Sequence, residues 1–330
     1  MGTSPATPAP ATATLLLPAS GRCLQPLPRS FAAALARADR LSDGIAGIRA
    51  QVLRHFAITP RGWPIAALTR EFDAGDADRS AWLRADPAWI RPDINGARML
   101  ACGERLQPTH ADIDAFLPAL RPVFGDAGFA FDAPAPARWY LCLPPGSPIP
   151  SFMDPTDVVG ADFFDHLPGG GQMDDASARR WRSLMSDVQV VLHNHPWNGR
   201  RAAMGKPPIN SLWFWGGGVM PDTVTAGQAM VWSDDPLVRA FASVVKTTTT
   251  DLPERFTPPG NDVLIDLRGT GPEALHDRWL APAIDAVRRR RLAGVQLDCL
   301  DGFRLELVSA HRWRLWRKPR SFVRSAGDVE

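Results

Sequence analysis

The stretch QAMVWSDDPLVRAFASVVK, residues 228 to 246, joins a short apolar strand directly to a helix. Its first part has the apolar character of a strand that is buried on both faces. Asp235 then supplies an N-cap side chain, and Pro236 suits the first helical position, where its missing N–H is not needed. A strand followed at once by a helix is the repeating unit of parallel sheets, so the stretch predicts an α/β fold.

Three further stretches have the same buried character. They are ATLLLPASG at 13–21, INSLWFW at 209–215 and DVLIDLRG at 262–269. We predict that the strands near residues 14, 211, 230 and 263 lie side by side in one mostly parallel sheet, with helices on both faces.

The segment VQLDCLDGFRLEL, residues 295 to 307, predicts a hairpin. Pairing Cys299 with Phe303 across a three-residue loop, with Gly302 left-handed, gathers the apolar side chains on one face, whereas a two-residue loop would divide them. The residues that then share a face are Val295, Leu297, Cys299, Phe303, Leu305 and Leu307.

The chain length of 330 residues corresponds to about two domains. Residues 1–12, rich in Pro, Ala and Thr, predict a disordered tail. From Trp82 the pattern changes to short strands, two of them around an Asn95-Gly96 turn, a strong hairpin signal. We expect an inserted α+β domain at 82–145, and one main α/β domain formed by 13–81 together with 146–330.

Composition excludes several classes of protein. With 45% hydrophobic and 22% charged residues, the chain can bury a sizeable core. A net charge of +2 is too small to favour nucleic acid as a partner. Arginine supplies nearly all cations, which suits carboxylate or phosphate binding but can equally reflect genomic base composition.

Location is constrained by what the sequence lacks. No apolar run approaches the roughly 18 residues of a membrane span, and the first residues lack the pattern of a signal peptide. The four cysteines form no C-x-x-C pair, which argues against a zinc ribbon or a disulfide framework. We therefore expect a cytoplasmic protein with no membrane partner.

The stretch HNHPWNGRRAAMGKPPINSLWFWGGG, residues 193 to 218, is the main candidate for a ligand site. It follows a predicted amphipathic helix at 175–195, whose apolar face ends in His195. Asn198, Arg200 and Arg201 follow Pro196, where unpaired N–H groups could hold an anion together with the backbone of Gly216 to Gly218. The alternatives are a buried histidine, a capping turn with solvated arginines, and a plain turn after a core strand.

Two other segments combine residues that can bind ligands. An acidic loop contains Asp154, Asp157, Asp162 and Asp165 with His166, but its spacing matches no EF-hand and is ordinary for caps and turns. The end HRWRLWRKPR interleaves arginine with tryptophan, which could suit nucleic acid or an acidic partner, but the near-zero net charge elsewhere favours a solvated terminal helix.

These pieces together resemble the archaeal-type, cofactor-independent phosphoglycerate mutases of the alkaline-phosphatase-like superfamily. The most specific match is HPWNGRRAAMGKPPINSLWFWGGG, with weaker similarity in WPIAALTREF, RPDINGARML, DPTDVVG, GQAMVWSDDPLVRAFA and NDVLIDLRG. The same strand signature resembles RpfE-type regulatory proteins of plant-pathogenic bacteria. The resemblance implies an α/β/α phosphatase-like sandwich with an inserted smaller domain. It implies ligand binding by the residues that match its motifs: His195, Asn198, Arg200, Arg201, Asn210, Gly216, Gly218 and Asp154.

The resemblance also implies phosphoryl transfer by a serine nucleophile and two metal ions, and here the chain departs from the pattern. Where the family has Asp-Gly-x-x-Asp after its first strand, this chain has Pro18-Ala19-Ser20-Gly21. The late Asp-rich segment is reduced to DLRGTGPEALHDRW, and Ser42 in RLSDGIAG only faintly matches the nucleophile. We expect no metal ion and no cofactor.

Two functions stay open on the sequence. The first is a regulatory protein with a degenerate metal site that binds a phosphorylated or acidic ligand or a protein partner. The second is an active phosphomutase or phosphatase with a rearranged site.

Overall fold

The computed structural model describes residues 10–24, 29–78, 80–93, 96–148, 151–163, 166, 175–314 and 316–317. The chain divides into two compact units. The sheet unit consists of residues 1–59 and 223–330, and the inserted unit consists of residues 60–222. The inserted unit thus includes residues 60–81 and 146–222 besides the expected 82–145. Most of the predicted tail and Asp165 lie outside the described residues.

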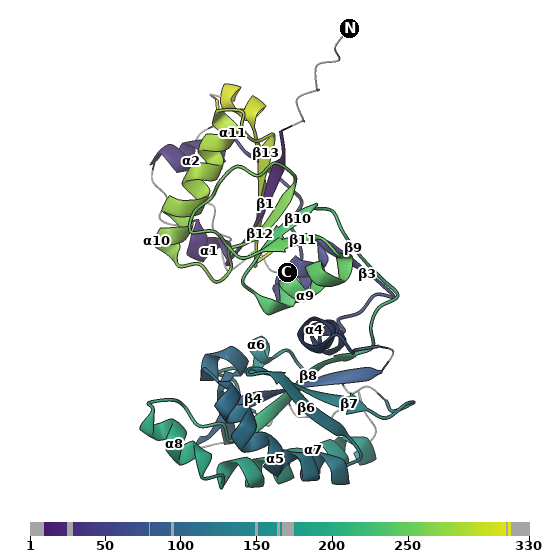
Figure 1. The fold of residues 1–330 in the computed structure, drawn as a ribbon. Helices are drawn as coiled ribbons and strands as arrows, with labels where there is room; N and C mark the ends of the chain where they lie inside the picture. Colours follow the sequence, from purple (N-terminus) through teal and green to yellow (C-terminus); the bar gives the residue numbers. More distant parts are fainter. Residues whose placement is uncertain are drawn as a thin grey trace. The chain divides into compact units, whose positions relative to one another are not determined.

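The sheet unit is built on a seven-stranded sheet in the order β11-β10-β12-β1-β13-β14-β2 (Figure 1). The strands from β11 to β13 run parallel, and β14 and β2 are antiparallel to their neighbours. The strands are β1 (Thr12–Leu17), β2 (Asp39–Arg40), β10 (Met230–Trp232), β11 (Thr248–Thr250), β12 (Val263–Asp266), β13 (Gly294–Cys299) and β14 (Arg304–Val308). The fold class is therefore α/β with a mostly parallel sheet, and the strands predicted near residues 14, 230 and 263 are adjacent as expected.

Helices flank this sheet, and a separate two-stranded ribbon joins β3 (Phe56–Thr59) to β9 (Thr223–Ala226). The helices are α1 (Ser20–Cys23), α2 (Arg29–Ala36), α3 (Ile48–Leu53), α9 (Pro236–Val245), α10 (Pro272–Ala274), a π-helical turn (Leu275–Leu280), α11 (Ala281–Arg288) and a 3-10 turn (Ser309–Trp313). The Asp235 side chain caps α9 by accepting a hydrogen bond from the Leu237 N–H at 2.8 Å, as the sequence predicts.

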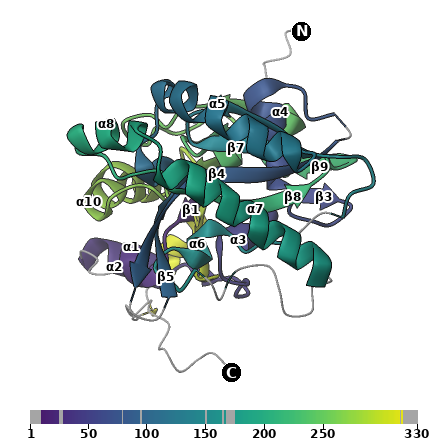
Figure 2. The ribbon, with the colours of Figure 1, turned by 90° about the horizontal axis from the view of Figure 1, so that it is seen from below.

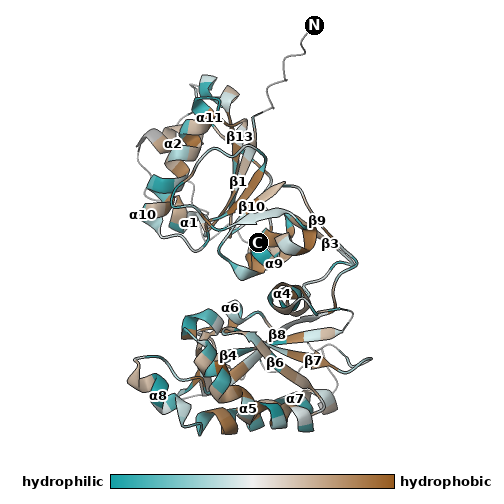
Figure 3. Ribbon diagram, viewed as in Figure 1, coloured by the Kyte–Doolittle hydropathy of each residue, from teal (hydrophilic) through white to brown (hydrophobic). Residues whose placement is uncertain are grey.

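The hairpin of β13 and β14 has the predicted register. Val295 pairs with Leu307 and Leu297 pairs with Leu305, so the apolar side chains share the buried face. Gly302 has a φ of 84°, and a side chain there would collide with the backbone of Gly44. These side chains join a core with those of β1, β12 and α11, and Figure 3 shows the hydrophobic residues concentrated on the central strands.

The inserted unit contains an antiparallel five-stranded sheet in which β4 (Ala81–Asp93) is central. The other strands are β5 (Gly96–Cys102), β6 (Ala130–Ala135), β7 (Arg138–Leu143) and β8 (Ser211–Gly218). Its helices are α4 (Ile65–Ala74), α5 (His110–Asp126), α6 (Pro155–Val158), α7 (Asp175–His193) and α8 (Trp197–Ala203), with a 3-10 turn at Gly103–Leu106. Helix α4 covers one face of the sheet, and α5 and α7 cover the other (Figures 1 and 2).

One strand prediction was wrong. The strand at residue 211, β8, does not join the parallel sheet but pairs antiparallel with β4 in the inserted unit. The reason is that the apolar sequence of β8 predicts only that both faces of the strand are buried, and not which strand it pairs with. Helices α4 and α7 bury it there, so its pattern is satisfied in either sheet. The predicted helix ends at His193, and His195 lies just beyond it.

Candidate functional site

The carboxyl edge of the parallel sheet is the natural place for a ligand in an open α/β fold. Two buried carboxylates lie there, Asp266 at the end of β12 and Asp298 near the end of β13. Both pair in register with Leu16 of β1, one on each side. Their side chains therefore project from the same face of the sheet, two strand spacings or about 10 Å apart.

Asp266 is held by the guanidinium of Arg268. The Arg268 Nε donates to Asp266 Oδ1 at 2.8 Å, and Nη2 donates to Oδ2 at 2.7 Å. The same Nη2 lies 2.8 Å from Asp235 Oδ2, and the Ser233 hydroxyl donates to Asp266 at 3.2 Å. Burial alone lowers the pKa of Arg268, but the hydrogen bonds and charges of Asp266 and Asp235 raise it above its usual value, so the guanidinium stays charged.

Asp298 is bound in a similar way. Arg54 donates to both carboxylate oxygens, at 2.6 and 2.9 Å, and His55 Nε2 lies 2.8 Å from Oδ2. Burial raises the pKa of Asp298, but hydrogen bonds from His55 and Arg54 outweigh burial and lower it below its usual value. The Gln51 side-chain amide links β1 and β13 by donating to the backbone carbonyls of Leu17 and Asp298.

Strand β1 itself ends without a carboxylate. Ser20, buried at the start of α1, donates both its N–H and its hydroxyl to Asp301 Oδ2. Among the described residues, no three His, Cys, Asp or Glu side chains converge as they would to hold a metal ion. The acids at this edge do not fit a pair of divalent ions, because Asp266 and Asp298 are already neutralised by arginine.

Sequence reasoning missed the arginines of this edge. The signal was partly readable, because Asp266 and Arg268 are two residues apart and project to the same side of an extended chain. Arg54 and Asp298 are 244 positions apart in the sequence, so no local pattern predicts their ion pair. Ser42, the nucleophile suggested by resemblance, is exposed on the loop after β2.

In the stretch 193–218, the structure uses Arg201 to join elements of the inserted unit. Arg201 is fully buried, and its Nη1 lies 2.7 Å from Asp112 Oδ1. It also donates to the backbone carbonyls of Pro207, at 2.9 Å, and Leu106, at 2.6 Å. Burial raises the pKa of Asp112, but hydrogen bonds from Arg201 and Trp197 more than offset burial and lower it.

The two asparagines of the motif bind backbone. The Asn198 side chain donates to the carbonyls of Leu192 and Ile209 and accepts from the Ile209 N–H. Asn210 donates to the Ile90 carbonyl at 2.7 Å and accepts from the Ile90 N–H at 2.8 Å. Each amide thus replaces backbone hydrogen bonds where the chain enters β8.

The remaining predicted residues have local contacts. The His195 ring lies 4.8 Å from that of Phe116, and burial lowers its pKa. Arg200 is exposed with its guanidinium over the Trp197 ring. Asp154 caps α6 by accepting from the Thr156 N–H. None of these contacts requires a ligand.

Gly216 and Gly218 allow close packing of β8 against α4. A Cβ at Gly218 would lie 2.5 Å from the Pro64 Cβ, and one at Gly216 would lie 3.1 Å from the Ile65 Cβ. Gly218 ends β8, roughly 23 Å along the strand from its first residue at about 3.3 Å per residue. The structure therefore does not bring the glycines and the arginines of this stretch into one pocket.

Comparison with known proteins adds family information. No family model matches the chain. It is 35% identical over 103 residues to a probable 2,3-bisphosphoglycerate-independent phosphoglycerate mutase of Geobacter sulfurreducens, covering 31% of this chain and 25% of that protein. Enzymes of the same name from Methanothrix thermoacetophila and Methanosarcina barkeri are each 40% identical over 67 residues, covering 20% of this chain and 16% of theirs. Over these segments the chain is similar to phosphoglycerate mutases. The similarity spans at most a quarter of the length of these relatives.

Two solved structures align with most of the chain. The cofactor-independent phosphoglycerate mutase of Thermoplasma acidophilum gives a TM-score of 0.41 with 14% identity, covering 91% of this chain and 90% of that one. A protein of Pyrococcus horikoshii gives 0.43 with 11% identity, covering 91% and 87%. Within the described residues, no helix has the length and apolar character to cross a membrane.

Proposed function

We propose that this phosphoglycerate mutase-like protein has a degenerate metal site and acts in regulation, by binding a phosphorylated or acidic ligand or a protein partner. The observation that supports this proposal is the state of the carboxyl edge. Strand β1 is followed by Ser20 at the start of α1 and not by a carboxylate, and the flanking acids Asp266 and Asp298 are held by Arg268 and Arg54.

The chemical consequence follows from what two metal ions contribute to phosphoryl transfer. They activate the nucleophile and stabilise the transferring oxygens, an effect of several kcal/mol or about a thousandfold in rate. A guanidinium already bound to its carboxylate cannot coordinate a nucleophilic oxygen as a metal ion does. The fold would persist while this chemistry is lost.

The proposed setting is the cytoplasm of a bacterium, with a regulatory role of the RpfE type. All four cysteines are free thiols, and Cys23 and Cys299 are buried, which is compatible with a reducing compartment. Arg201 is fully buried. Binding of a ligand by the motif residues from His195 to Gly218 would therefore require a local conformational change that exposes Arg201.

The alternative is an active phosphomutase or phosphatase with a rearranged site. One contact favours it: the Ser20 hydroxyl donates to Asp301 at the carboxyl edge, an arrangement in which a carboxylate could accept the proton of a serine nucleophile. Ser20 is 1% exposed, so a substrate could reach it only after a rearrangement.

The discriminating experiment combines metal analysis with an activity assay. The purified full chain would be incubated with Mn²⁺, desalted and analysed by mass spectrometry, and 3-phosphoglycerate turnover would be measured with the Geobacter sulfurreducens relative as positive control. We expect no stoichiometric metal and no turnover. Robust turnover that Ser20→Ala or Ser42→Ala abolishes would overturn the regulatory proposal and establish the alternative.

A further inference from the structure

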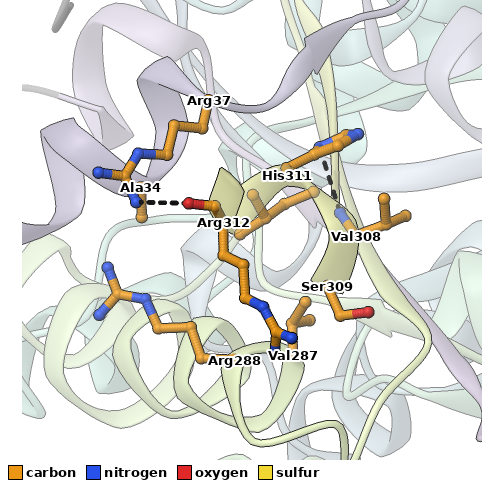
Figure 4. A pocket seen from close by; sticks show the side chains of 9 residues that line it. Ala34, Arg37, Val287, Arg288, Val308, Ser309, His311 and Arg312 are labelled. Atoms are coloured by element: carbon orange, nitrogen blue, oxygen red, sulfur yellow. Dashed lines mark hydrogen bonds between the residues drawn. The ribbon is translucent and has the colours of Figure 1, made fainter. Parts of the chain in front are cut away.

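A small pocket in the sheet unit lies at the opposite edge of the parallel sheet from Asp266 and Asp298. Leu307 and Val308, which line it, pair with Val295 and Gly294 at the beginning of β13. The pocket is therefore at the amino edge of the parallel strands. Its walls come from the end of α2, the end of α11, the end of β14 and the 3-10 turn that follows (Figure 4).

The lining of this pocket combines basic and apolar side chains. Arg37, Arg288 and Arg312 reach it from three different elements, and Figure 4 shows their side chains around the pocket. Ser309 and His311 supply a hydroxyl and an imidazole. No lining residue in the described part of the chain is acidic, and the other lining residues are Ala34, Val287, Leu307 and Val308.

Three carboxylates near the pocket in sequence have partners of their own, and Glu306, next to Leu307, accepts a hydrogen bond from Gln296. Asp285 of α11 forms ion pairs with Arg289 and Arg291. Asp39 lies 3.2 Å from His311 Nε2 and also pairs with Arg314 and Arg317. Among the described residues, neither Arg37 nor Arg312 forms an ion pair with these carboxylates.

Two of the arginines keep donors for a ligand. In the described part of the chain, Arg37 donates one hydrogen bond, from Nη1 to the Arg312 carbonyl at 3.3 Å, and a guanidinium has five N–H groups. The Arg312 guanidinium lies over the Trp313 ring, 4.8 Å from its centre, a contact that uses its face and leaves its N–H edge available.

His311 lines the pocket as a neutral ring and adds no positive charge to it. Its Nδ1 accepts from the Val308 N–H at 3.4 Å, the contact dashed in Figure 4, while Nε2 faces Asp39. A ring that accepts at one nitrogen and donates at the other is neutral. The Ser309 hydroxyl adds a neutral donor at the same wall.

We propose that this pocket binds the phosphoryl group of a phosphate monoester. Planar guanidinium forks match phosphate oxygens, and several of them around one site favour a dianion over a monoanion. The free space of about 30 Å³ is two to three times the roughly 10–15 Å³ that a water needs. The pocket is therefore too small for a whole metabolite, so only a small group at one end of a ligand would enter it and the remainder would extend outside. This site is independent of the metal site discussed above.

A competing role for these arginines is to stabilise the ends of α2 and α11, whose last carbonyls carry partial negative charge. That role needs one cation at each helix end and is complete without a ligand. It predicts loss of stability, but no change in anion binding, when Arg37 or Arg312 is replaced. Binding measurements therefore separate the two roles.

The test is calorimetric titration of the full chain with inorganic phosphate, 3-phosphoglycerate and, as a monoanion control, chloride. We expect millimolar or tighter binding of phosphate and tighter binding of the monoester. Arg37→Gln and Arg312→Gln should each weaken phosphate about 10- to 100-fold, the effect of losing a charge-assisted hydrogen bond. Arg312→Lys should weaken it less, since it retains charge but not the fork.

The matched control is Arg289→Gln, which removes an equal charge from an exposed arginine outside the pocket. It should leave the affinity unchanged, and phosphate should raise the melting temperature of this variant as it does that of the unaltered chain. The proposal is overturned if phosphate does not bind at millimolar concentration, or if Arg289→Gln weakens binding as much as Arg312→Gln. It is also overturned if folded Arg37→Gln and Arg312→Gln variants bind phosphate normally.

Discussion

The two edges of the parallel sheet use arginine in opposite ways. At the carboxyl edge, Arg268 and Arg54 are each locked onto a buried carboxylate. At the amino edge, Arg37 and Arg312 line a pocket in which none of the described lining residues is acidic. The first arrangement closes the place where an α/β fold would ordinarily bind its ligand. The second leaves N–H donors of these arginines available at the amino edge, where α/β folds rarely bind a ligand.

This difference shows that an arginine can be assigned to a ligand site only when its contacts within the protein are known. Arg201 was one of the residues that the sequence predicted to bind a ligand, and in the structure it contacts a buried carboxylate and two backbone carbonyls. Charge that is satisfied inside the protein stabilises or specifies the fold, whereas charge without a protein partner is available for binding. The four predictions below test this contrast.

The largest effect is expected for Arg201→Met. Asp112 is 1% exposed and would remain as a buried carboxylate without its cation, so the free energy of unfolding should fall by about 3–5 kcal/mol. Urea unfolding followed by tryptophan fluorescence measures this loss. The double variant with Asp112→Leu should recover part of it. A fully stable Arg201→Met protein that has instead lost anion binding would show that Arg201 belongs to a ligand site.

Arg268→Met should have a similar effect at the carboxyl edge, at the lower end of that range or about 3 kcal/mol, because Arg268 is slightly more exposed than Arg201. Arg37→Met at the other edge should change the free energy of unfolding by no more than about 0.5–1 kcal/mol. The same urea measurement compares the two. Equal losses would remove the distinction between the edges.

A smaller effect is expected for Gly218→Ala in β8. The added methyl group would lie 2.5 Å from the Pro64 Cβ, and relieving this overlap should cost about 1–3 kcal/mol. Gly199→Ala in α8 meets no atom within 4 Å and should stabilise the helix by about 0.5–1 kcal/mol. Thermal unfolding of both variants is the check. If Gly218→Ala were neutral, close packing would not explain the glycine.

The smallest effect concerns His311 and pH. Burial and the charges of Arg314 and Arg317 lower the pKa of His311 below its usual 6.5, although Asp39 and Glu306 oppose them. The unfolded chain therefore binds the proton more readily, so the contribution of a neutral His311 is complete above pH 6.5 and declines as pH falls below it. The slope is at most about 1.4 kcal/mol per pH unit.

His311→Gln should accordingly flatten the loss of stability between pH 7.5 and pH 5.5, measured by urea unfolding in a phosphate-free buffer. His195, whose pKa is also lowered, provides the comparison, because its replacement should remove a separate part of the slope. A steeper loss in His311→Gln would mean that the folded protein favours the charged ring.

Much of the fold was readable from local patterns. The Asp235 cap, the register of 295–307 and the helix from Asp175 each depend on residues within a few positions of one another. Periodicity identifies which face of an element is buried, and turn chemistry fixes the register. The adjacency of β10, β12 and β1 also followed, since strand–helix units form parallel sheets.

The sequence by itself therefore determined the α/β class, the strands near residues 14, 230 and 263, the hairpin at 295–307 and the absence of a carboxylate after the first strand. Only the tertiary structure decided that β8 pairs with β4, that Arg201 meets Asp112, and that three arginines share a pocket. The physical reason is that residue types alone indicate which side chains are apolar and which are charged. Which residue pairs with which depends on contacts between distant parts of the chain. Arg201 and Arg312 are chemically alike, and only what surrounds them distinguishes a structural ion pair from a binding group.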